Sequence, residues 1–69
     1  MFNKYHARQK VRVNGIGKNN DKYYSGQIGK VVERDAFFCD YLVSFENGKS
    51  DWFDEQYLTP IRKYKKKGD

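Results

Sequence analysis

The side chains of this 69-residue sequence that are best suited to chemistry are cations interleaved with aromatic rings. Cations bind phosphate groups, and flat rings stack on unpaired bases, so the combination predicts nucleic-acid binding of low sequence specificity. The candidate contact residues are Lys10, Arg12, Lys18, Lys22, Tyr23, Tyr24 and Lys30, together with Lys63, Lys65, Lys66 and Lys67 near the C-terminus. A second interpretation stays open, in which the rings close the ends of a small barrel and the lysines are solvated surface.

Charge is distributed unevenly along the chain, although the net charge is only +5. Residues 1–34 carry eight basic and two acidic side chains, residues 35–61 carry one basic and six acidic, and residues 62–69 carry five basic and one acidic. The sequence therefore predicts a basic side, an acidic side and a basic tail, and such asymmetry bears on binding partners more than on fold.

The acidic segment supports an alternative function as a protein-interaction or assembly module. A cationic patch on a partner, or on a second copy, could meet this acidic hairpin side, which allows a monomer or a weak homo-oligomer. The candidate residues for this alternative are Phe37, Phe38, Asp51, Phe53, Asp54, Glu55 and Tyr57.

Catalysis and cofactor binding have little support in the sequence. His6 has no nucleophile or carboxylate near it, and one His with one Cys cannot supply a four-ligand metal site. We therefore expect no enzyme activity, no cofactor and no metal. The single cysteine, Cys39, cannot form an internal disulfide, which fits a reducing cytoplasm, and no apolar run is long enough to span a membrane.

The elements that must position these residues are short strands. Residues 1–9 are unpatterned and predict a flexible lead-in, residues 10–61 a single domain, and residues 62–69 a basic disordered tail. Val11 and Val13 alternate with Lys10 and Arg12, so the valines should face the core. The predicted elements are a strand at 10–13, a loop at 14–25, strands at 26–34, 40–46 and 49–53, a single helical turn at 54–57 and a strand at 58–61.

Two glycines predict details of the sheet, namely a hairpin turn and a bulge. Asn47-Gly48 favours a two-residue type I′ turn, in which Val43 opposes Trp52 and Leu42 opposes Phe53. Trp52 would then share the core face with Val43 and Phe45. In the strand at 26–34, a bulge at Gly29 would turn both Ile28 and Val31 inward.

Residues 10–61 resemble the SH3-like barrel superfamily. The resemblance is carried by Lys10-Val11-Arg12-Val13, Ser25-Gly26-Gln27-Ile28-Gly29-Lys30-Val31-Val32, Tyr41-Leu42-Val43-Ser44-Phe45, Asn47-Gly48 and Trp52-Phe53 followed by Leu58. The Gly-x-x-Gly-x-Val segment is similar to the KOW motif, and the hairpin is similar to Tudor-type modules. The resemblance implies an all-β, five-stranded, partly open barrel with a one-turn 3-10 helix before the last strand, and a non-catalytic binding role.

Two narrower comparisons follow from this resemblance, one with a ligand-binding cage and one with an enzyme family. A Tudor-like aromatic cage for methylated Lys or Arg would use Tyr41, Trp52, Phe53 and Tyr57. The chain is also similar in length and layout to type II dihydrofolate reductases, but it has Ser50-Asp51-Trp52-Phe53 where their Val-Gln-Ile-Tyr signature would stand. A short chain of this type is typical of phage- or plasmid-encoded accessory proteins.

Overall fold

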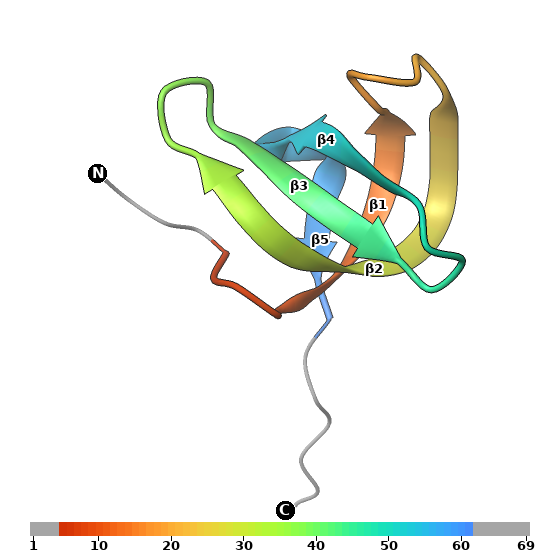
Figure 1. The fold of residues 1–69 in the computed structure, drawn as a ribbon, viewed down its shortest axis with the longest axis horizontal. Coiled ribbons are helices and arrows are strands. Elements are labelled where there is room, and N and C mark those ends of the chain that lie inside the picture. Colours follow the sequence, from red (N-terminus) through yellow and green to blue (C-terminus); the bar gives the residue numbers. More distant parts are fainter. Residues whose placement is uncertain (1–4, 62–69) are drawn as a thin grey trace, which may run out of the picture.

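The computed structural model describes residues 5–61, which form five antiparallel strands and one 3-10 turn, with no α-helix among them (Figure 1). The strands pair in the order β4-β3-β2-β1-β5 and make one strongly curved sheet that does not close. The elements are β1 (Lys10–Ile16), β2 (Tyr23–Asp35), β3 (Asp40–Phe45), β4 (Ser50–Asp54), η1 (Glu55–Tyr57) and β5 (Leu58–Pro60). The predicted all-β, five-stranded fold is confirmed.

The burial of side chains along β1 confirms the predicted alternation between core-facing and exposed residues. Val11 and Val13 are fully buried, whereas Lys10 and Arg12 are exposed on the opposite face. Both strands are longer than predicted, so the connecting loop is residues 17–22 and not 14–25. Tyr23 and Tyr24 consequently lie in β2, where successive side chains point to opposite faces.

The bulges in β2 lie at positions other than the predicted Gly29. Gly26 is an extra residue opposite Val13 and Asn14, and its φ of 70° is one that glycine adopts readily. Val32 is the second extra residue, opposite Leu42 and Val43. Between these two bulges the strand alternates normally, so Val31 is buried while Ile28 stays 45% exposed.

The hairpin of β3 and β4 has a register one residue away from the prediction. Gly48 N–H donates to the Phe45 carbonyl at 3.0 Å and Phe45 N–H donates to the Lys49 carbonyl at 2.8 Å, so the loop has three residues. Gly48 has a φ of 88°, whereas Asn47 does not have a positive φ, as expected for a type I turn followed by a bulge. Leu42 therefore pairs with Trp52, and Val43 pairs with Asp51.

This one-residue shift exchanges the two faces of β4, because side chains alternate along a strand. Phe53, and not Trp52, is fully buried, and the Trp52 side chain is only half-buried. The Phe53 ring contacts Tyr24 and Phe45 edge to face, with ring centroids 5.1 and 6.1 Å apart. The buried apolar core consists of Tyr5, Val11, Val13, Tyr24, Val31, Tyr41, Val43, Phe45, Phe53 and Leu58.

Within the predicted lead-in at 1–9, Tyr5 packs against the sheet, whereas residues 6–8 are exposed. Tyr5 is 2% exposed, its hydroxyl donates to the Leu58 carbonyl at 2.9 Å, and its ring meets Tyr41 edge to face. Arg8 N–H donates to the Val31 carbonyl. The predicted basic tail at 62–69 lies outside the described residues. Within residues 5–61, no helix has the length and apolar character needed to cross a membrane.

Candidate functional site

Three exposed cations gather on the outer face of β1 and β2. Lys10 and Lys30 are direct cross-strand partners, and Arg12 follows two residues after Lys10 on the same face, opposite Ile28. Among residues 5–61, no carboxylate lies within ion-pair distance of these three side chains. Among the described residues, their charged groups make one long polar contact, from Arg12 Nη1 to the Gly26 carbonyl at 3.4 Å. We call Lys10, Arg12 and Lys30 the cationic face.

A groove of about 800 Å³ runs beside this face. Its apolar surface includes Ile28 and Val32, each 45% exposed, and Lys10 and Lys30 border it. Glu46 is its one carboxylate. The residues that line the groove are Lys10, Gly26, Ile28, Gly29, Lys30, Val32, Ser44, Phe45 and Glu46.

Tyr23 extends the same face at its other end. It pairs with Ile16, and both side chains are exposed, by 61% and 46%. Ile16 lies six positions after Lys10, which is roughly 20 Å along an extended strand. An exposed ring and a group of cations therefore lie on one surface, although they are not in contact.

The last described residue, Ile61, lies beside β1 next to Lys10. Ile61 N–H donates to the Lys10 carbonyl at 3.1 Å, and β5 pairs with β1 through Val11, Arg12 and Val13. Arg62 follows Ile61 directly in the sequence. The candidate residues Lys63, Lys65, Lys66 and Lys67 themselves lie outside the described residues.

Lys18 and Tyr24 do not belong to this surface. The Lys18 ammonium donates to the Asp40 carboxylate at 2.7 Å, and this hydrogen bond raises the pKa of Lys18 above its ordinary value. Tyr24 is 4% exposed and stacks on Phe45, with ring centroids 5.1 Å apart, so its ring cannot receive a base. Lys22 lies over the Tyr24 ring, 5.4 Å from the centroid.

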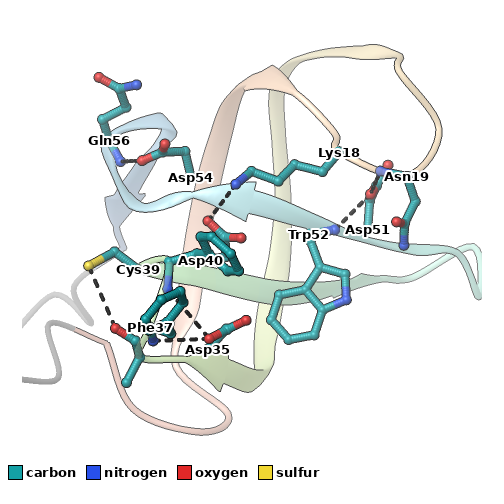
Figure 2. A network of polar contacts seen from close by, with 12 residues as sticks. Lys18, Asn19, Asp35, Phe37, Cys39, Asp40, Asp51, Trp52, Asp54 and Gln56 are labelled. Carbon is teal, nitrogen blue, oxygen red and sulfur yellow. Dashed lines mark hydrogen bonds and ion pairs between the residues drawn. The ribbon is translucent and has the colours of Figure 1, made fainter.

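A buried carboxylate organises the loop at 17–22. Asp51 is fully buried and accepts hydrogen bonds from the backbone N–H groups of Asn19, at 2.8 Å, and Asn20, at 3.1 Å, as Figure 2 shows in part. The Asn20 side-chain amide adds a third bond at 3.0 Å. Gly17 packs so closely that an added Cβ would lie 2.0 Å from Asp51 Oδ2. Asp51 is thus a structural residue and not part of an acidic binding surface.

The other candidates on the acidic side are divided between core and surface. Phe53 is buried, whereas Asp54, Glu55 and Tyr57 are half-buried. Asp54 is the N-cap of η1 and accepts the Gln56 N–H at 3.3 Å. Because Tyr41 and Phe53 are core residues, at 2% and 0% exposure, the predicted aromatic cage does not form. Within the described residues no cluster of His, Cys, Asp and Glu could hold a metal ion.

Phe37 and Phe38 are the most exposed large apolar side chains of the described residues, at 84% and 63%. They lie in the connection between β2 and β3, with ring centroids 4.8 Å apart in an edge-to-face arrangement. Asp35 Oδ1 accepts the N–H groups of Phe37, at 3.0 Å, and Phe38, at 3.5 Å (Figure 2). The sequence placed these rings among the candidate protein contacts, and the structure exposes both.

No protein-family model and no curated protein matches this chain. Among solved structures, the chain is similar to the NMR structure of Bacillus subtilis protein YorP, with a TM-score of 0.71 and 28% sequence identity. The similarity covers 91% of this chain and 76% of that chain. It therefore extends over most of the sheet and supports a small β-barrel-like fold.

Proposed function

We propose that this chain is a non-catalytic binding module that holds nucleic acid on the outer face of β1 and β2, with low sequence specificity. The observation that carries the proposal is the cationic face, in which Lys10, Arg12 and Lys30 lie together without a carboxylate partner among residues 5–61. Glu46 borders the same groove, but it is not within ion-pair distance of these three cations.

The direct pairing of Lys10 with Lys30 favours an anionic ligand. Like charges opposite each other on adjacent strands destabilise a sheet, and a bound phosphate relieves their repulsion. A phosphate backbone offers such anions at regular intervals, so a row of cations along β1 and β2 suits a chain of phosphates better than a single anion. The basic sequence after Ile61 would add further phosphate contacts from a point beside Lys10.

Tyr23 supplies the aromatic part of the proposed interface. Its ring is 61% exposed on the same face, so a base could stack on it while phosphates reach the cations. We infer low sequence specificity because the interface consists mainly of cations that contact phosphates and a ring on which any base can stack.

We assign the fold more specifically to the SH3-like barrels with KOW- or Tudor-like features. The meander of β1 to β4 with β5 returning beside β1 supports this assignment. We further place the protein in a reducing compartment such as the cytoplasm, since Cys39 is exposed and free.

Fluorescence anisotropy of labelled oligonucleotides tests the proposed function. Single-stranded DNA, single-stranded RNA and duplex DNA of mixed sequence would each be titrated with the full chain at several salt concentrations. We expect binding at low salt. The logarithm of the binding constant should fall linearly with the logarithm of the salt concentration, with a slope of about −0.7 to −0.9 for each phosphate contacted. Unchanged anisotropy with all three probes at low salt would rule the proposal out.

A further inference from the structure

The exposed rings of Phe37 and Phe38, in the connection between β2 and β3, have no role in the proposed nucleic-acid interface. We call this pair of rings the aromatic tip. The two side chains are 84% and 63% exposed, yet their backbone is held firmly. Asp35 accepts both of their N–H groups, and the Cys39 carbonyl accepts the Glu55 N–H at 3.1 Å, which ties the connection to η1. Adjacent apolar rings on an ordered turn are typical of a surface that is covered by a partner.

The groove on the same protein has the shape and chemistry to receive this tip. It is an open groove of about 800 Å³, which is large enough to admit an aromatic side chain. Ile28 and Val32 supply apolar contact surface at 45% exposure each, and such surface gains from covering an aromatic ring.

The charges beside the tip and the groove are complementary. Arg34 and Asp35 precede the aromatic tip, whereas Lys10, Lys30 and Glu46 border the groove. The carboxylates near the tip, Asp35, Asp54 and Glu55, can therefore face the two lysines of the groove. A membrane surface fits less well, because Asp35 precedes the tip and Asp54 and Glu55 lie beside Asp40 and Cys39, which follow it.

The tip and the groove lie at opposite ends of β3, so one copy cannot fill its own groove. The tip precedes Asp40 at the start of β3, and the groove reaches Phe45 and Glu46 at its end, as the β2–β3 and β3–β4 connections in Figure 1 show. We propose that the aromatic tip of one copy binds in the groove of a second copy, which gives a head-to-tail assembly. Such an interface uses two different surfaces, so it extends into a ring or a filament.

This inference does not rest on the proposed function, but it shares Lys10 and Lys30 with it. A groove that holds the tip of another copy cannot hold nucleic acid at the same lysines. Because a tip of a few residues buries less than a standard interface of about 1,600 Å², the contact should be weak and should be sought at concentrations up to about 1 mM.

Sedimentation equilibrium of the full chain, without nucleic acid, tests the assembly. We compare the wild type with the tip variant Phe37→Ser/Phe38→Ser and the groove variant Val32→Glu. Ile16→Glu is the matched control, since Ile16 is 46% exposed and does not line the groove. Thermal melts of each variant check that the sheet is intact, so that a loss of association is not a loss of folding.

We expect the average mass of the wild type and of Ile16→Glu to rise beyond a dimer with concentration, while each of the other two variants stays monomeric. An equal mixture of the tip variant and the groove variant should form dimers and nothing larger, because only one intact tip and one intact groove remain per pair. A wild type that stays monomeric at about 1 mM would overturn the proposal. So would association of the folded tip variant like that of the wild type, or a mixture that stays monomeric.

Discussion

The Lys18 ammonium lies 2.7 Å from the carboxylate of Asp40, and this ion pair joins the loop at 17–22 to the start of β3. Asp40 is 6% exposed as a residue, whereas the Lys18 side chain is 44% exposed. The pair gives a structural role to Lys18, which the sequence placed among the candidate nucleic-acid contacts.

Replacing Lys18 with Gln should therefore lower the stability of the fold. The substitution leaves Asp40 buried without its cation, and we expect a loss of about 1 kcal/mol, limited by the partial exposure of the lysine. Urea unfolding measures the loss. Lys22→Gln, which removes an equal charge from the same loop without breaking an ion pair, is the control and should cost less.

Stability should also fall at alkaline pH. The pKa of Tyr5 is raised above its ordinary value of 10.0, first because burial disfavours the phenolate, and the pKa of Lys18 is raised above 10.5, first by its hydrogen bond to Asp40. Both groups keep their protons longer in the folded than in the unfolded chain. Their contribution is therefore complete below pH 10 and is lost as the pH rises through the folded values.

The variant Tyr5→Phe should reduce this alkaline dependence. It removes one of the two titrating groups, and it also removes the hydrogen bond to the Leu58 carbonyl, which costs about 1 kcal/mol at neutral pH. Urea midpoints measured between about pH 8 and pH 11 give both effects. A wild-type midpoint that rises over this range would contradict the assignment.

Asp51→Asn should destabilise the protein by about 2 kcal/mol, because a neutral amide offers one acceptor oxygen where the buried carboxylate offers two to the N–H groups of Asn19 and Asn20. Asp54→Asn is the matched control. Asp54 is half-buried and caps η1 through a single bond to Gln56, and Asn is an equally good N-cap. Thermal unfolding should separate the two variants clearly, and equal stability would show that the loop does not depend on Asp51.

The hairpin register is tested by truncating its two neighbouring aromatic side chains. Phe53→Ala should cost about 3–5 kcal/mol, since Phe53 is fully buried, whereas Trp52→Ala should cost much less. Circular dichroism during urea titration reports both values. A larger loss for Trp52→Ala would support the register that the sequence suggested.

Local patterns predicted much of the fold. Val11 and Val13 alternate with cations, and this pattern alone placed them in the core and placed Lys10 and Arg12 on the outer face. The hairpin turn was also located correctly at Asn47 and Gly48. The length of the hairpin loop was predicted wrongly, because Asn-Gly suits both a two-residue turn and a three-residue loop that ends at a bulge. The choice between these two loops moves every side chain of β4 to the other face of the sheet.

The remaining errors involve partners that are distant in the sequence. Asp51 receives its hydrogen bonds from residues 31 and 32 positions away, and no local pattern reveals that it is buried. Tyr5 is likewise buried by contacts with Tyr41 and Leu58. The sequence pattern placed Lys10 and Arg12 on one face, but only the strand register shows that Lys30 and Tyr23 share that face.

The most direct test of the central claim is the salt dependence of oligonucleotide binding by Lys10→Gln/Lys30→Gln. The control is Arg34→Gln/Lys49→Gln, which removes the same charge from two exposed residues that neither line the groove nor belong to the candidate contacts. If the cationic face binds phosphates, the first variant loses affinity for every probe sequence and its log–log salt slope becomes shallower by about 1 per lysine, while the control changes little. Equal losses in the two variants would show that net charge, and not the face formed by β1 and β2, is responsible.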